Sequence, residues 1–303
     1  MTDTCRLCPR DCGANRAEGQ AGVCGVAGPG IRAARAALHM WEEPCISGET
    51  GSGAVFFFGC PLRCVYCQNR DIARAAAGVT ISWERLAEIF LELEAQGAAN
   101  INLVTPTHYT PEIIRAVKRA REQGLSVPIV HNGSGYDRPE VLRSLEGIVD
   151  IYLTDFKYME AETAARYSRA PDYPAVAQEA LSEMVRQAPE PVFDENGMMR
   201  RGVIVRHLLL PGHLRNARAV VRYVHETYGN RVCLSLMNQY TPMPGIEKEY
   251  PELGRRVTAR EYERLVDYAL SLGVENGFIQ EGDTAQESFI PAFDGEGILR
   301  DEY

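Results

Sequence analysis

A loop of three cysteines directly follows a strongly apolar segment, and this pairing constrains the fold more than any other feature. The apolar run at 54–58 favours a buried β-strand. The following residues read FGCPLRCVYC (58–67), which spaces the cysteines as C-x3-C-x2-C. Three thiolates leave a four-coordinate structural zinc site one ligand short. They can instead hold three irons of a [4Fe–4S] cluster and leave the fourth iron open; a zinc loop or scattered buried cysteines are the alternatives.

A second group of cysteines lies near the N-terminus. Cys5, Cys8, Cys12 and Cys24 are spaced C-x2-C-x3-C-x11-C among several glycines, which allow a short chain to fold tightly around a metal. Four thiolates can ligate either a tetrahedral zinc or an iron–sulfur cluster, and both interpretations stay open. Cys45 is either a further ligand or a small buried residue. Reduced thiols in a flexible arm are the alternative for the whole group.

Strand-like and helix-like segments alternate from residue 54 onward, which favours a parallel sheet with crossover helices. The expected strands are 54–59, 100–106, 127–132, 149–156, 203–210 and 231–238, with a further short strand at 276–280. The expected helices are 83–96, 111–123, 139–145, a pair within 160–187, 215–227 and 259–272. Ser82 is the expected N-cap of the first helix, and 189–202 and 239–257 are expected to be exposed loops.

Charge and composition limit the class of protein. The chain of 303 residues has a net charge of −9 and a pI near 5.3, so nucleic acid is not expected as its main partner. Its apolar runs are shorter than the ~20 residues that cross a bilayer, and the N-terminus lacks the pattern of a signal peptide. We therefore expect a cytoplasmic protein without a membrane partner, whose nine cysteines serve as metal ligands rather than disulfides.

The cysteine loop resembles the cluster motif C-x3-C-x-aromatic-C of the radical S-adenosylmethionine (radical SAM) enzymes. The resemblance implies that Cys60, Cys64 and Cys67 hold a [4Fe–4S] cluster, with Tyr66 beside the cofactor and S-adenosylmethionine on the open iron. It also implies a partial (β/α)6 TIM-like barrel over 51–282. A cysteine-rich metal-binding appendage (1–50) would precede the barrel, and a C-terminal tail (283–303) would follow it.

Within this superfamily the chain is most similar to the pyruvate formate-lyase-activating-enzyme-like proteins, in a branch with an extra N-terminal cysteine cluster. The strings that carry the likeness are CPRDCG (8–13), EEPCISG (42–48) and RHLLLPG (206–212). The GGE-type turn that holds the cofactor's amino group in many radical SAM enzymes is absent, and Thr105 and Thr107 are the expected substitutes.

Polar residues at the ends of the expected strands should face the cofactor or the substrate, because the carboxyl ends of the strands meet at one rim. These candidates are Thr105, Thr107, His108, Asn132, Ser134, Asp155, Lys157, Arg206 and Asn238. The resemblance implies that the Asn132 turn and Asp155 approach the cofactor and help to hold a monovalent cation. Arg206 offers a planar fork suited to the methionine carboxylate of the cofactor or to an acidic substrate.

The family likeness implies reductive cleavage of S-adenosylmethionine to a 5′-deoxyadenosyl radical, which abstracts hydrogen from a substrate. The specific expectation is a glycyl residue of a partner enzyme, with a flavodoxin or ferredoxin as reductant. A small molecule or a peptide is the alternative substrate. A different class, an iron–sulfur or metal carrier or an electron-transfer protein, is the further alternative.

Overall fold

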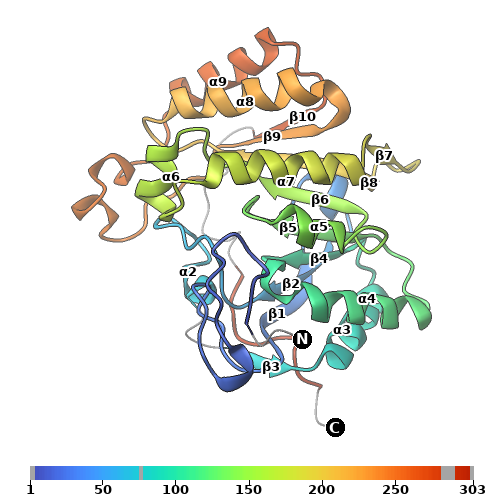
Figure 1. Ribbon diagram of the computed structural model, residues 1–303. Helices are drawn as coiled ribbons and strands as arrows, with labels where there is room; N and C mark the ends of the chain where they lie inside the picture. Colours follow the sequence, from blue (N-terminus) through green and yellow to red (C-terminus); the bar gives the residue numbers. More distant parts are fainter. Residues whose placement is uncertain (1–3, 75–77, 281–290, 301–303) are drawn as a thin grey trace.

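A single curved sheet forms the centre of the protein (Figure 1). The structure is a computed structural model and describes residues 4–74, 78–280 and 291–300. Its strands are β1 (Ile31–His39), β2 (Ser52–Phe57), β3 (Val79–Ile81), β4 (Ile101–Val104), β5 (Ile129–Gly133), β6 (Ile151–Asp155), β7 (Val192–Phe193), β8 (Met199–Leu208), β9 (Cys233–Met237) and β10 (Gly277–Ile279). Its α-helices are α1 (Pro44–Ser47), α2 (Arg70–Ala73), α3 (Trp83–Ala95), α4 (Thr110–Glu122), α5 (Pro139–Arg143), α6 (Ala161–Ser168), α7 (Tyr173–Gln187), α8 (Leu214–Tyr228) and α9 (Ala259–Ser271).

The strand order is β10-β9-β8-β6-β5-β4-β2-β1-β3, with β7 paired to β8. The stretch from β2 to β10 is parallel throughout, whereas β1 runs antiparallel to both of its neighbours and β7 runs antiparallel to β8. The path has two ends, so the described part of the chain forms an open sheet. The mixed α/β fold with a central sheet agrees with the sequence prediction, and the six expected parallel strands are all present.

Local signals placed most elements correctly. Ser82 caps α3 as expected, because its side chain accepts a hydrogen bond from the backbone N–H of Arg85. The prediction of an exposed loop over 189–202 was wrong, since β7 and the start of β8 lie there. Strand β1 and helix α1 lie within residues 1–50, the range predicted for the appendage, and β1 pairs with β2 of the central sheet.

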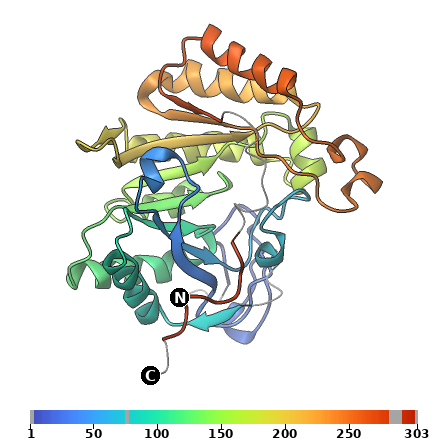
Figure 2. The ribbon, with the colours of Figure 1, turned by 180° about the vertical axis from the view of Figure 1, so that it is seen from behind.

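Separate apolar clusters pack against the two faces of the sheet. Helices α3, α4, α7, α8 and α9 lie along the outer face (Figure 1) and bury the main core against the strands. On the inner face, seen from behind in Figure 2, the short helix α1 packs Cys45 and Ile46 against Ile151, Leu153 and Ile204. The inner face therefore holds both apolar contacts and the side chains that β5, β6 and β8 direct away from the helices.

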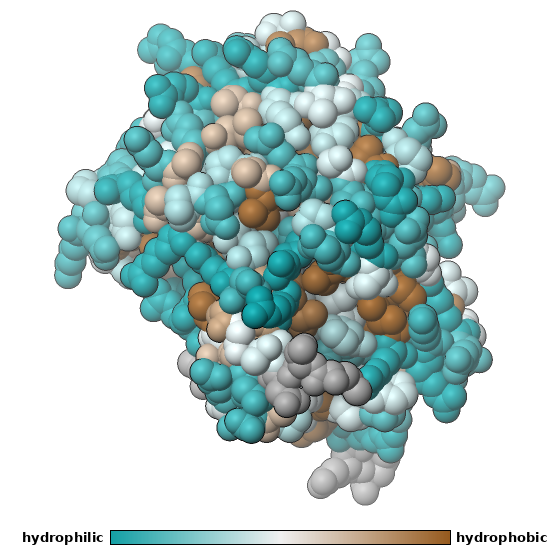
Figure 3. Space-filling model, viewed as in Figure 1, coloured by the Kyte–Doolittle hydropathy of each residue, from teal (hydrophilic) through white to brown (hydrophobic). Residues whose placement is uncertain are grey.

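The outer surface carries mostly hydrophilic residues on the side shown in Figure 3. Within the part of the chain that the structure describes, no helix has both the length and the apolar character to cross a bilayer.

The described part of the C-terminal tail runs along β1. The backbone N–H of Gly295 donates to Ala34 O at 2.9 Å, and the N–H of Ala36 donates to Glu296 O at 2.9 Å. Arg35 forms ion pairs with Asp294 and Glu296 at 3.1 and 2.5 Å. The tail thus continues the hydrogen bonding of the sheet beyond β1.

A glycine substitution tests how closely the tail is seated. Gly297 and Gly147 have nearly equal backbone angles, with φ of +71° and +73°. A Cβ on Gly297 would collide with the carbonyl oxygen of Ala36, whereas a Cβ on Gly147 meets open space. Both Gly→Ala changes cost about 1–2 kcal/mol for the left-handed backbone. We expect only Gly297→Ala to abolish hydrogen-exchange protection of the Ala36 amide; equal protection in both variants would contradict a tightly seated tail.

Candidate functional site

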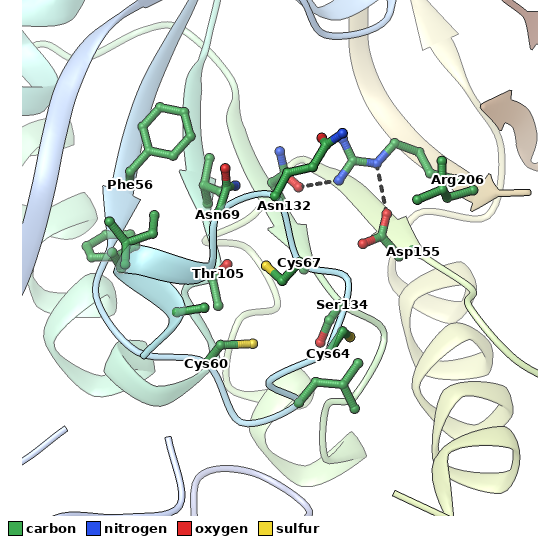
Figure 4. A pocket seen from close by; sticks show the side chains of 18 of the residues that line it. Phe56, Cys60, Cys64, Cys67, Asn69, Thr105, Asn132, Ser134, Asp155 and Arg206 are labelled. Atoms are coloured by element: carbon green, nitrogen blue, oxygen red, sulfur yellow. Dashed lines mark hydrogen bonds and ion pairs between the residues drawn. The ribbon is translucent and has the colours of Figure 1, made fainter. Parts of the chain in front are cut away.

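A pocket of about 240 Å³ opens at the carboxyl ends of the parallel strands, and all three cysteines of the 58–67 loop line it. Figure 4 shows Cys60, Cys64 and Cys67 on one turn of chain, with Asn132, Asp155 and Arg206 across the pocket from them. Thr105 and Ser134 also line this space. The structure therefore brings the loop together with the rim residues of β4, β5, β6 and β8, where this type of sheet places its chemistry.

The loop starts at a glycine that no other residue could replace without strain. Gly59 has φ of +89°, and a Cβ there would lie 2.5 Å from Val26 Cγ2 and 3.0 Å from Cys24 O. The loop is therefore pressed against the N-terminal segment from its first residue. Burial raises the pKa of Cys60 to about 11 and, together with the neighbouring thiols, that of Cys67 to about 12. Both thiols are protonated at neutral pH in the free protein, so metal binding would release their protons.

A chain of hydroxyl groups ends on the sulfur of Cys64. The hydroxyls of Tyr66 and Tyr158 lie 2.6 Å apart, and Tyr158 Oη lies 2.8 Å from Ser168 Oγ. Ser168 Oγ donates to Cys64 Sγ at 3.1 Å. Because the serine proton is used on sulfur, Ser168 must accept from Tyr158, which in turn accepts from Tyr66. Tyr66, the aromatic residue of the cysteine motif, is thus the first donor in a series of hydrogen bonds that ends on Cys64 Sγ.

Arg206 lies at the centre of the polar side of the pocket. Its guanidinium contacts Glu42 Oε2 at 3.0 Å, Asp155 Oδ1 at 3.2 Å and Asn132 Oδ1 at 2.6 Å. The other oxygen of Glu42 accepts from the amides of Asn132 and Asn102 at 3.0 and 2.9 Å. Each of the three guanidinium nitrogens of this largely buried arginine therefore has an acceptor, as a charge with little access to water requires. A ligand carboxylate at Arg206 would have to share these contacts.

Lys157 completes the charge balance of the pocket. Its Nζ lies 2.7 Å from Asp155 Oδ2, so both oxygens of Asp155 have a cationic partner. Burial alone would raise the pKa of Asp155, but Lys157 and Arg206 outweigh it and hold that pKa below its usual value. A monovalent cation at Asp155 would compete with these two side chains. The two carboxylates and the two cations of this group balance one another.

The structure brings most of the predicted site residues to the pocket. Those that line it are Cys60, Cys64, Tyr66, Cys67, Thr105, Asn132, Ser134, Asp155, Lys157 and Arg206. Thr107, His108 and Asn238 do not line it. Thr107 donates to Asp137 at 2.6 Å, and His108 Nε2 lies 2.6 Å from the carbonyl oxygen of Phe58. Burial lowers the pKa of His108 to about 4, so this side chain is a neutral support under the strand that precedes the loop.

Several pocket residues were not predicted from sequence. His39, the last residue of β1, lines the pocket together with Trp41 and Glu42 of the segment that follows it. The only sequence signal for Glu42 was its place in the string EEPCISG, where two acidic residues precede an apolar segment. Its ion-pair partner Arg206 is too distant in sequence for a local pattern to connect the two residues.

The remaining cysteines divide into two groups. Cys45 and Cys233 pack in the core of the inner face, so Cys45 lies apart from the N-terminal cysteines. Cys5, Cys8, Cys12 and Cys24 lie close enough together that the other three raise the pKa of Cys8, although burial is the larger cause. Among residues 4–74, 78–280 and 291–300, no three His, Cys, Asp or Glu side chains are spaced to hold a single metal ion.

The residues of the pocket fit an iron–sulfur cluster with one open iron. Three thiols on one loop face a common space, and a serine hydroxyl already donates to one of the sulfurs. Hydrogen bonds to the thiolates are a usual feature of such centres. The polar groups of β5, β6 and β8 border the same space, where a ligand of the open iron would lie.

Comparison with known proteins gives a family for this part of the chain. Residues 54–188 match the model of the radical SAM superfamily. The uncharacterized protein MJ0674 of Methanocaldococcus jannaschii is 29% identical over 273 residues, covering 88% of this chain and 74% of that protein. A pyruvate formate-lyase-activating enzyme of Clostridium pasteurianum is 32% identical over 130 residues, which is 41% of this chain and 53% of that enzyme.

Among solved structures, Streptococcus suis SuiB bound to S-adenosylmethionine is similar with a TM-score of 0.50 and 12% identity. The match covers 75% of this chain and 49% of SuiB, so the chain spans about half the length of that protein. At this identity the likeness concerns the fold alone.

The contact between Glu42 and Arg206 can be tested through stability. Glu42→Gln keeps the shape but removes the charge, and we expect a loss of unfolding free energy near the lower end of about 3–5 kcal/mol, because Arg206 keeps Asp155. Glu140→Gln is the control, since Glu140 is exposed and lies 3.8 Å from Arg138; its expected cost is under about 0.5 kcal/mol. Urea unfolding measures the loss of unfolding free energy in each variant, and equal losses would refute a structural role for the Glu42–Arg206 pair.

Proposed function

Because residues 54–188 form a radical SAM superfamily domain, we propose that this chain is an enzyme that reductively cleaves S-adenosylmethionine and abstracts hydrogen from a substrate. When bound, a reduced [4Fe–4S] cluster supplies one electron that splits the cofactor into methionine and a 5′-deoxyadenosyl radical. The observation that carries the proposal is the pocket shared by Cys60, Cys64, Cys67 and the polar rim. A flavodoxin- or ferredoxin-type protein is the proposed reductant.

The residues of the chain have separate tasks in this proposal. Cys60, Cys64 and Cys67 hold the cluster. Thr105 lies on the rim with φ of +59°, an unusual conformation for a β-branched residue, which turns its backbone at the pocket wall. Ser134 and Asn132 offer polar atoms to the cofactor, and the neutral group around Arg206 keeps the opposite wall in place.

A glycyl residue of a partner protein is the substrate that we propose. The pocket, about 240 Å³, is smaller than the ~300–1,000 Å³ usual for small-molecule sites. With the cluster and cofactor bound, little of this space would be left, so we expect the substrate at the mouth of the pocket, where a polypeptide loop can enter. Trp41 and Met40 are exposed beside this mouth, at 57% and 43%, and exposed aromatic and Met residues are typical of protein interfaces. In the reaction, the glycine Cα–H bond would break, the hydrogen atom would pass to the 5′-deoxyadenosyl radical to give 5′-deoxyadenosine, and the unpaired electron would stay on the glycine.

Cofactor cleavage is the primary test. The protein is reconstituted anaerobically with iron and sulfide, reduced with dithionite and given S-adenosylmethionine, and 5′-deoxyadenosine is measured by mass spectrometry. We expect product from the unchanged protein and from Cys233→Ala, whose thiol lies in the inner core, but none from Cys64→Ala. Failure of the intact, reduced protein both to bind and to cleave the cofactor would favour a metal-carrying or electron-transfer protein.

The substrate class can be tested with an isotope label. Extract from cells of the source organism, grown on glycine deuterated at Cα, is divided by ultrafiltration into protein and small-molecule fractions. We expect deuterium in 5′-deoxyadenosine only with the protein fraction. Label arising only from the small-molecule fraction would refute the glycyl-residue proposal and leave the radical chemistry standing.

The hydrogen bond from Ser168 to Cys64 predicts a redox effect. Ser168→Ala removes a donor from a cluster sulfur, so we expect the reduction potential of the cluster to fall on the order of tens of millivolts. Ser144→Ala is the matched control, because Ser144 Oγ donates to Val141 O on the exposed surface. Potentiometric titration followed by electron paramagnetic resonance gives both values. Identical potentials would remove Ser168 from the cluster environment.

A further inference from the structure

The first three N-terminal cysteines lie on one compact loop, residues 5–14, which we call the cysteine knuckle. The backbone N–H of Cys5 donates to Ala14 O at 2.9 Å, and the N–H of Gly13 donates back to Cys5 O at 3.2 Å. A turn inside the loop is closed by the N–H of Asp11, which donates to Cys8 O at 3.1 Å. These bonds bring the two ends of the loop together, so Cys5, Cys8 and Cys12 belong to one small folded unit.

A second turn brings the fourth cysteine to the knuckle. Gly22 N–H donates to Val26 O at 3.0 Å, and Cys24 lies within this turn. A Cβ on Gly22 would lie 3.3 Å from Cys24 Sγ and 3.4 Å from Cys12 Sγ. The two sulfurs therefore flank the same point, and a larger residue at position 22 would press on both. Cys24 is thus brought next to Cys12 of the knuckle, the loop that also carries Cys5 and Cys8.

An arginine with a spare donor lies beside these thiols. Arg16 directs one terminal nitrogen to Cys24 Sγ at 3.5 Å and the other to the carbonyl oxygen of His108 at 2.7 Å. Its Nε is buried and has no hydrogen-bond partner among the described residues. An unpaired buried donor is costly, and it lies on the guanidinium that already touches a cysteine. Such a donor suits an anionic centre with acceptor atoms of its own.

The spacing of the thiols favours a centre larger than one ion. A tetrahedral zinc holds each sulfur at about 2.3 Å, which requires all four thiols to lie in close contact. In the described segments, no three His, Cys, Asp or Glu side chains lie close enough together to hold one metal ion. The N-terminal cysteines share this wider spacing with Cys60, Cys64 and Cys67. An iron–sulfur cluster spreads its cysteine ligands around several metal atoms and accepts four of them.

We propose that Cys5, Cys8, Cys12 and Cys24 bind a second iron–sulfur cluster rather than zinc, and that this centre supports the loop of the first. Cys24 O accepts a hydrogen bond from the N–H of Cys60 at 3.2 Å. The backbone of one proposed ligand of the second centre therefore holds the first cysteine of the 58–67 loop. Arg10, from the knuckle, donates to Pro61 O at 2.8 Å and to Ser168 O at 2.7 Å. Only this supporting role depends on the proposed function.

Metal content tests the second centre directly. The full chain with Cys60, Cys64 and Cys67 all changed to Ala is reconstituted anaerobically with iron, sulfide and an equal amount of zinc. We expect this triple variant to keep about two or four irons per chain with matching sulfide, depending on cluster type, and no stoichiometric zinc. One zinc per chain, or no bound metal, would overturn the proposal.

Two further variants assign the retained iron to the knuckle. Adding Cys12→Ser to the triple variant should remove the remaining iron, whereas adding Cys233→Ser should not. Cys12 is exposed and Cys233 is buried, so loss of iron with Cys12→Ser alone cannot be attributed to unfolding. Equal retention in both would show that Cys12 is not a ligand and would refute the four-cysteine centre.

The supporting role has its own readout. In the otherwise unchanged protein, Cys12→Ser should lower hydrogen-exchange protection of residues 59–64, and unaltered protection would refute that role. If the unchanged protein and the triple variant held equal iron, the first cluster would be absent and the proposed function would fail. That result would leave the iron of the knuckle intact, so the two failures are distinguishable.

Discussion

One largely buried guanidinium links the strand ends that form the pocket. Arg206 of β8 contacts Asp155 of β6, Asn132 of β5 and Glu42 of the segment before α1. Each of these groups would be costly to bury alone, and each is acceptable because the others are present. Their contacts therefore bind separate elements of the sheet to one another at the level of the cysteine loop. The shape of the pocket therefore depends on a balance of charges as well as on the apolar packing beneath it.

Local sequence patterns were sufficient for the parallel strands and their helices. Apolar runs such as 149–156 are buried on both faces, and this type of strand has a strong signal in one sequence. The strand β1 was missed because IRAARAALH (31–39) is rich in alanine and arginine, which are poor strand formers on their own. It forms a strand because it pairs with β2 along most of its length. The segment 189–202 was misread for the same reason, since β7 is a strand only through its pairing with β8.

The site was predictable where a residue's place follows from the strand that carries it. Asp155 of β6 and Arg206 of β8 are direct register partners, so their meeting at the rim follows from the parallel sheet. The prediction placed Thr107 and His108 at the pocket because they follow β4. The left-handed backbone of Thr105 instead turns the chain away from the pocket. The side chains of Thr107 and His108 therefore form hydrogen bonds inside the protein, with Asp137 and with the carbonyl oxygen of Phe58. Glu42 could not be predicted, because its role exists only through a partner on a distant strand.

The tail along β1 has a consequence for how the protein behaves in a test tube. Strand edges with free backbone groups recruit strands from other molecules, and natural proteins cover them. Here Gly295 and Glu296 occupy the hydrogen-bonding groups of Ala34 and Ala36. A proteolytic cut ahead of residue 291 would uncover that edge while leaving the pocket residues of the parallel strands in place. Protein that has lost its C-terminal tail should therefore be checked for self-association before a loss of activity is attributed to damage at the pocket.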